Sequence, residues 1–332
     1  MHRISLGNTV FEGANSTYCF DGESTVLIDT GVAIDETRAE LESELAALGV
    51  EFADVDAIVL THYHADHSGL AGEIQAESDA TVYAHPADAP LIAGDAGAWE
   101  DLEATQRRLF EEWGMPEPAR EELLGFLRMS ESEGIYGEPV DVTPVEDGET
   151  LSFGVGTDER ELELEVCHTP GHTAGHICLV HDEEIFTGDA LLPEYTPNVG
   201  GADVRVDRPL EQYLRTLEII ADGGFDRAWP GHREPIDDPA QRARRIRDHH
   251  EERAFRVLSA LESSEPADAW TVSDRLFGDL STIHILHGPG EASAHLEHLT
   301  RTGALERGDA GYRLADGVEE RIREREDGRW PL

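Results

Sequence analysis

The chain has 332 residues, which is long enough for one large domain and a smaller one. It carries 70 acidic residues against 26 basic ones, a net charge of −44, and every basic residue is Arg. This composition argues against binding a polyanion through charge alone, and it is typical of halophilic proteins, whose hydrated carboxylates tolerate molar salt.

Cysteine content and hydropathy indicate the cellular setting. Cys19, Cys167 and Cys178 are an odd number in a large chain, which favours reduced core residues over a disulfide framework. No run of 18 apolar residues occurs, and the first 20 residues hold no continuous apolar stretch. We therefore expect a cytoplasmic protein with neither a membrane span nor a signal peptide.

Strands and helices alternate over residues 1–239. Apolar runs predict the strands, and apolar residues at helical spacing predict the helices. The expected strands cover 24–31, 56–62, 80–86, 162–170 and 226–232, with a hairpin over 176–191. The expected helices cover 35–49, 68–78 and 209–221, and a pair broken at "GMPEP" fills 98–130.

The composition changes at about residue 240. A long Arg-rich helix over 240–262 precedes "WTVSDRLF", a helix that includes 291–306, and a hairpin over 307–314. Helix, helix, hairpin is the order of a winged helix. Residues 240–332 hold 14 Arg against 18 acids, a net of −4, whereas residues 1–239 carry −40. We therefore divide the chain into a larger domain, 1–239, and a 240–332 winged-helix-like domain with its linker helix.

The stretch "THYHADHSGL", residues 61–70, crowds metal-binding side chains into one loop after an apolar strand. His62 and His64 stand at i and i+2, so both side chains leave a strand on the same side and can converge on one ion. Asp66 and His67 follow where the chain turns toward a helix, and they point elsewhere. One short loop can therefore face two metal positions.

Four further motifs follow the same order as in a known family. "HYHADH" resembles the HxHxDH motif of the metallo-β-lactamase superfamily. With the four other motifs, the resemblance to this superfamily covers about residues 5–237. The four are "LIDTG" around Asp29, "TPGHTAGH" with His172, "FTGDALL" with Asp189, and "WPGHREP" with His232.

The resemblance implies an α/β fold and a ligand set. The fold would be a four-layer αβ/βα sandwich with the site at one edge of its sheets, here with a helical insert and a C-terminal winged-helix domain. Asp29 would orient the ligand loop, and Asp66 and Asp189 would be catalytic. The implied ligands are His62, His64 and His172 for the first metal, Asp66, His67 and His232 for the second, and Asp189 between them.

These ligands indicate hydrolysis. Two divalent ions about 3.5–4 Å apart can hold a bridging hydroxide as nucleophile and polarise the bond that is cut. Nitrogen and oxygen donors suit Zn, with Fe or Mn as alternatives. No Cys stands in a ligand motif, which disfavours antibiotic hydrolysis. His64 stands where the diiron flavoproteins usually have Glu, which disfavours an oxygen-reducing site. The remaining pattern resembles glyoxalase II, the related thioesterases and lactonases, and the nucleases of the superfamily.

Several features have two interpretations. His168 and His176 could line the pocket, but a bond to the backbone is favoured. The insert, 98–130, is either a lid over the substrate or a pair of helices packed on the sandwich. Other histidines lack ligand spacing, and we expect them at the surface or in packing: His85, His181, His249, His250, His284, His287, His295 and His298.

The C-terminal domain leaves two function classes open. A sandwich followed by a long helix and a winged helix resembles the lactamase-beta-like group, which includes an endoribonuclease. Arg301, Arg307 and Arg313 could contact nucleic acid, yet acidic residues lie among them. Packing or formation of a homodimer is favoured. We expect a hydrolase of a small ester or thioester, with a metal-dependent endoribonuclease or nucleic-acid-binding protein as the alternative.

The net charge of −44 predicts that the folded chain depends on salt. Carboxylate repulsion is less screened when salt is removed, so the unfolding midpoint should be lower in about 0.1 M than in about 3 M KCl. Thermal unfolding followed by circular dichroism measures this. Equal midpoints at the two concentrations would contradict the halophilic interpretation.

Overall fold

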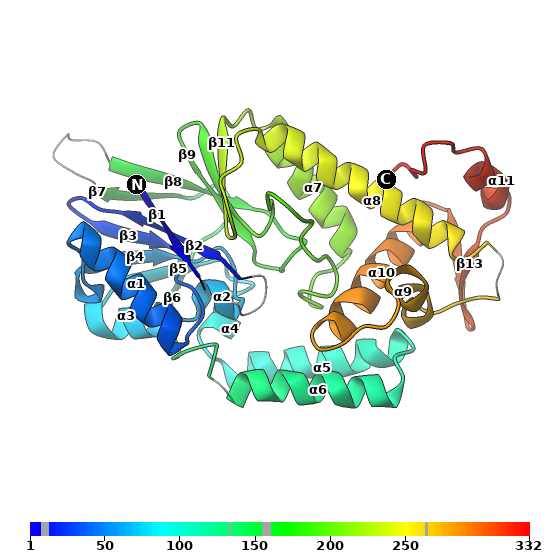
Figure 1. The fold of residues 1–332 in the computed structure, drawn as a ribbon, viewed down its shortest axis with the longest axis horizontal. Coiled ribbons are helices and arrows are strands. Elements are labelled where there is room, and N and C mark those ends of the chain that lie inside the picture. Colours follow the sequence, from blue (N-terminus) through cyan, green and yellow to red (C-terminus); the bar gives the residue numbers. More distant parts are fainter. Residues whose placement is uncertain (8–12, 133, 155–160, 263–264) are drawn as a thin grey trace.

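The computed structural model describes residues 1–7, 13–132, 134–154, 161–262 and 265–332. Within these ranges, two β-sheets pack face to face (Figure 1). The first sheet has the order β1 (His2–Leu6), β2 (Asn15–Phe20), β3 (Thr25–Ile28), β4 (Val55–Val59), β5 (Thr81–Ala84), β6 (Val142–Pro144). The second has the order β11 (Arg227–Pro230), β10 (Glu184–Gly188), β9 (Ile177–His181), β8 (Glu161–His168), β7 (Thr150–Gly154).

Strand direction decides which ends of the strands meet. In the first sheet β3, β4, β5 and β6 run parallel, and β1 and β2 are antiparallel additions. In the second sheet β7 to β10 are antiparallel, whereas β10 and β11 run parallel. The carboxyl ends of β10 and β11 therefore meet at one edge.

Alternating side chains fill the interior on both faces of each sheet. On β3, Val26 and Ile28 pack against the second sheet, while Leu27 points to the opposite face. Leu27 there meets Leu41 of α1 (Asp35–Leu48) and Ile74 of α3 (Ala71–Ser78). On the far side of the second sheet lie α7 (Pro209–Asp222) and α8 (Pro239–Ser259). The expected α/β class, with two sheets between helical layers, is confirmed.

Local signals set the helix boundaries. The predicted helix over 35–49 is α1, and it ends because Gly49 takes a left-handed conformation, with φ of 82°. The predicted helix over 68–78 is divided into α2 (Ala65–Ser68) and α3. The helix expected through residue 306 ends at Arg301, because Gly303 is left-handed and Leu305 already belongs to a strand.

The insert is a helical pair, and one end of it packs on the sandwich. α5 (Ala96–Glu112) and α6 (Glu117–Ser132) extend away from the sheets toward the C-terminal helices (Figure 1). Only the start of α5 joins the core of the first sheet, through Trp99 and Leu102. Trp113 is instead buried among C-terminal side chains, and its carbonyl accepts a hydrogen bond from the Trp270 amide at 2.8 Å. The pair thus bridges the sandwich and the C-terminal region.

The C-terminal region has the expected order of helix, helix and hairpin. It consists of α8, α9 (Ala269–Phe277), α10 (His284–Arg301), β12 (Leu305–Gly308), β13 (Gly311–Leu314) and α11 (Val318–Arg323). A core of its own joins these elements to the end of the helical pair. Its identification as a winged helix, and the boundary at residue 239, stay predictions.

The cysteines and the hydropathy of the helices can be compared with the expectations from the sequence. Cys19 and Cys178 are buried, Cys167 is half-buried, and all three are free thiols. Among the described residues, no helix is both long and apolar enough to cross a membrane.

The packing of the helical pair predicts a stability role for Trp113. Truncating a buried aromatic side chain typically costs about 3–5 kcal/mol, so Trp113→Ala should lower the thermal midpoint while leaving metal content intact. Ile219→Ala, which truncates an apolar side chain that is exposed on α7, is the matched control and should change little. An unchanged midpoint with a raised KM would favour the lid interpretation.

Candidate metal centre

The seven predicted ligands come from loops at the carboxyl ends of strands. His62, His64, Asp66 and His67 follow β4 and enter α2. Each of the other three follows another strand: His172 lies in the loop after β8, Asp189 directly after β10, and His232 two residues after β11. Strands that end at one edge thus bring together residues that are up to 170 positions apart in the sequence.

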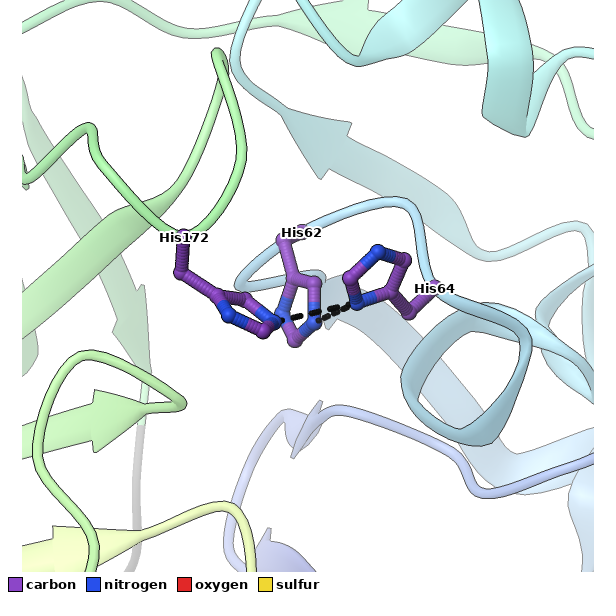
Figure 2. A group of neighbouring side chains, drawn as sticks. All are labelled: His62, His64 and His172. Carbon is purple, nitrogen blue, oxygen red and sulfur yellow. Dashed lines mark hydrogen bonds between the residues drawn. The ribbon is translucent and has the colours of Figure 1, made fainter. Parts of the chain in front are cut away.

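His62, His64 and His172 form one group of imidazoles (Figure 2). His62 Nε2 lies 3.0 Å from His64 Nδ1, and His172 Nε2 lies 3.1 Å from the same atom. In Figure 2 the three rings point toward one another from two separate loops. Three ring nitrogens about 3 Å apart have the spacing of donors that share one ion at about 2.0–2.1 Å.

Asp66, His67 and His232 form a second group, and Asp189 lies between the two. His232 Nε2 is 3.5 Å from Asp66 Oδ2, and His67 Nε2 is 3.8 Å from the same oxygen. One oxygen of Asp189 lies 3.5 Å from His67 Nε2 and 3.4 Å from His232 Nε2. Its other oxygen lies 3.7 Å from His172 Nε2, so this carboxylate reaches both groups.

The outer nitrogen of each imidazole in the first group faces a hydrogen-bond acceptor. His172 Nδ1 lies 3.1 Å from the Asn198 carbonyl, and His64 Nε2 lies 3.1 Å from the Ala202 carbonyl. His62 Nδ1 lies 3.0 Å from Thr61 Oγ1, which itself donates to a carboxylate. A carbonyl can only accept, so the outer nitrogens of His64 and His172 carry the protons. The inner nitrogens then present lone pairs, as metal ligands must.

The second group follows the same rule, and Asp29 supplies its principal acceptor. His67 Nδ1 donates to Asp29 Oδ2 at 2.9 Å, and His232 Nδ1 donates to the Gly13 carbonyl at 2.9 Å. Asp29 also accepts from the amide and the hydroxyl of Thr61, both at 2.8 Å. This buried carboxylate therefore holds both the strand end and one imidazole, as expected for a residue that orients the ligand loop.

Burial and neighbouring charges shift the pKa values of four of the imidazoles, two downward and two upward. Burial lowers the pKa of His62 well below its usual value, and burial with the neighbouring His172 lowers the pKa of His64 to about 4. Burial also acts on His67 and His232, but Asp189 and Asp66 outweigh it. The pKa of His67 is therefore well above its usual value, and that of His232 is about 9.

Asp189 has the opposite balance. Burial would raise its pKa, but His232 and His67 hold the pKa of this carboxyl well below its usual value. The carboxylate is thus charged and available as a ligand. Three buried polar atoms at this point have no hydrogen-bond partner: His67 Nε2, His232 Nε2 and Asp189 Oδ1. Buried polar atoms without a hydrogen-bond partner destabilise the fold unless another group binds them. Two imidazole nitrogens and a carboxylate oxygen that converge fit a metal ion.

His168 and His176, which flank the motif of His172, both form hydrogen bonds with the backbone. His168 Nε2 donates to the Ala174 carbonyl at 2.9 Å, and His176 Nε2 accepts from the Asp189 amide at 3.1 Å. A bond to the backbone was the favoured interpretation for both residues, and it is confirmed. His176 does more than expected, because the amide that it holds belongs to the carboxylate reaching both groups.

A buried ion-pair network beside the site has no signal in the sequence. Arg205 pairs with Asp88 and Asp203, both at 2.7 Å. Asp88 accepts from Thr173 Oγ1 at 2.7 Å, and the network therefore holds the loop that carries His172. Asp88 lies 117 residues before Arg205 in the sequence, so no local motif could have revealed their pairing.

Comparison with known proteins agrees with this geometry. The sequence pattern described as "Metallo-beta-lactamase superfamily" matches residues 10–232. The chain belongs to the metallo-beta-lactamase superfamily. This span contains all seven residues of the candidate centre, and it ends at His232.

Relatives within this superfamily extend over nearly the whole chain. "Probable metallo-hydrolase YqjP" of Bacillus subtilis is 27% identical and covers 87% of this chain and 88% of its own. "Atrochrysone carboxyl ACP thioesterase" of Aspergillus fumigatus is 25% identical, covering 77% and 62%. A metallo-beta-lactamase family protein from Thermus thermophilus has a TM-score of 0.78 at 32% identity, over 95% of this chain and 97% of its own. The chain is accordingly a metal-dependent hydrolase.

The position of Asp189 predicts metal stoichiometry. Reconstituted protein should carry about two divalent ions per chain, and Asp189→Ala should lose at least one, because the carboxylate between the groups is removed. Metal content after gel filtration is the measurement. Asp56→Ala, which removes a carboxylate that accepts a hydrogen bond from the Thr25 amide, is the control and should keep both ions. Wild-type content near zero after reconstitution would overturn the assignment.

Proposed function

We propose that the chain is a binuclear metal-dependent hydrolase acting on a small ester or thioester. The observation that carries this is the pair of three-residue groups with Asp189 lying between them. Zn is the proposed metal, with Fe or Mn as alternatives, since nitrogen and oxygen donors suit all three. Two such ions, when bound, supply a water-derived nucleophile near neutral pH and polarise the bond that is cut.

The chain's own residues would position the reaction. Hydrogen bonds on the outer side fix all five imidazoles, so no ligand has to reorganise as charge develops. Asp66 and Asp189 are the carboxylates at the reacting centre, and the Asn15 side chain donates to Asp66 at 3.3 Å. Tyr63 lies against His64, with ring centroids 4.6 Å apart, and Trp99 lies beside Tyr63. These aromatic rings are the proposed wall for an apolar acyl group.

Charge supports a small substrate over RNA. The catalytic region carries a net −40, which repels a polyanion. Two of the three arginines considered for nucleic acid are occupied: Arg301 pairs with Glu211 at 2.7 Å, and Arg313 pairs with Glu306 at 2.5 Å. Arg307 lies over the Tyr312 ring. The name of the Aspergillus fumigatus relative, a thioesterase, supports the same choice.

The C-terminal region is proposed to pack on the catalytic domain. Stacking of RNA bases would need exposed aromatic rings. Tyr312 is buried, Trp270 packs against the C-terminal core, and Phe277 lies under the Arg253 guanidinium. These three aromatic residues are therefore already used in packing. The endoribonuclease remains the alternative because of the helix, helix, hairpin order.

Substrate class is tested by direct comparison. Metal-loaded protein is incubated with a thioester and ester panel and with single-stranded RNA in about 2–3 M KCl, where charge-driven RNA binding is weak. We expect thioester or ester turnover that Asp66→Ala abolishes. RNA cleavage that is lost in the same variant, without ester or thioester turnover, would show that the substrate assignment is wrong and would favour the nuclease.

A further inference from the structure

The loop between β10 and α7 supplies two acceptors to the first group of imidazoles. The Asn198 carbonyl holds His172 Nδ1, and the Ala202 carbonyl holds His64 Nε2, each at 3.1 Å. The positions of residues 198–202 therefore fix the orientation of both rings. The remaining imidazole of this group, His62, is held by Thr61 and does not depend on this loop.

The same loop is bound to helix α10 of the C-terminal region. Asn198 Nδ2 donates to the His287 carbonyl at 3.2 Å and lies 3.5 Å from a carboxylate oxygen of Glu291. Asn198 Oδ1 accepts from the Gly201 amide at 3.0 Å, which closes the loop on itself. One side chain thus connects the helix to the backbone that holds His172.

Close backbone packing reinforces this connection. A Cβ atom at Gly200 would lie 2.6 Å from the Gly290 carbonyl oxygen, and one at Gly201 would lie 2.6 Å from the Cα of His287. Neither position has room for a side chain, so loop and helix are in direct backbone contact. His287 was expected to be a surface or packing residue, and its backbone also contributes to the support of the centre.

We propose that Asn198 is a positioning residue for the first metal, through which helix α10 fixes the orientation of His172 and His64. The inference rests on the proposed binuclear site. It assigns the C-terminal region a direct part in metal binding rather than a role in packing alone. Loss of the side-chain amide of Asn198 should release the loop from α10. His172 and His64 would then no longer be held toward His62.

The test compares the metal affinities of two amide truncations. Asn198→Ala should weaken one of the two metal equivalents by roughly 10- to 100-fold, as is typical when the partners of metal ligands are removed, and leave the other unchanged. Competition titration with a chromophoric chelator measures affinity, and the absorption spectrum of the Co²⁺-loaded protein reports the geometry of the ligands. Thermal unfolding of the metal-free forms gives the accompanying loss of stability.

Gln75→Ala is the matched control. The Gln75 side chain also bridges backbone, donating to the carbonyls of Ala80 and Asp141 and accepting from the Asp141 amide, but it lies on α3 away from the centre. Its truncation should lower stability without changing affinity for either metal. Equal losses of affinity in the two variants would show that Asn198 acts only through general stability, and would overturn the proposal.

Asn198→Asp covers the case in which the alanine variant does not fold. This change keeps the acceptor for the Gly201 amide but removes the donor to His287 and places a second carboxylate near Glu291. We expect weakened binding of the same metal equivalent. Wild-type affinity and Co²⁺ spectrum in either variant would refute the inference while leaving the binuclear site intact. A wild-type protein that binds no metal would instead refute the site itself.

Discussion

The buried carboxylate of Asp29 is the constraint on which the metal centre depends. It accepts hydrogen bonds from the Thr61 amide, the Thr61 hydroxyl and His67 Nδ1, and so ties the end of β4 to the helix that follows. The Thr61 hydroxyl in turn orients His62. One carboxylate therefore sets the direction of an imidazole in each group. The backbone of Asp29 is left-handed, with φ of 57°, which is unfavourable for a residue other than glycine. The hydrogen bonds of its side chain offset this cost.

Arginine has a particular role in so acidic a chain. Arg205 compensates two buried carboxylates beside the His172 loop. Arg242 of α8 instead donates to the carbonyls of Leu192 and Tyr195, in the segment that runs from Asp189 to Asn198. The planar guanidinium suits such forked contacts better than an ammonium group does. These two arginines thus hold loops of the centre.

Strands and helices contribute to the centre in different ways. Strand ends of the sandwich supply every candidate ligand, whereas α7, α8 and α10 hold the loop after Asp189. The helical pair α5 and α6 joins the two regions, with Trp99 at the sandwich end and a core around Trp113 at the other end. Such a division lets the ligand set stay rigid while the surrounding loops define the pocket.

Local patterns in the sequence were enough to predict the family, the seven candidate ligands and the order of helices and strands. These patterns are apolar periodicity, the short "HYHADH" motif, and a glycine such as Gly49 at the end of a helix. This order has gaps, because the patterns gave no strand for β1, β2, β6 or β7, and they placed the end of α10 beyond Arg301. How these parts support one another was instead established by tertiary packing. The contact of Asn198 with α10, the placing of Arg205 between Asp88 and Asp203, and the packing of Trp113 on the C-terminal core all join distant segments. A lone Asn or Arg has many possible partners along a chain. Which partner it meets depends on how sheets and helices pack, because hydrogen bonds and ion pairs require contact within a few ångströms rather than closeness in sequence.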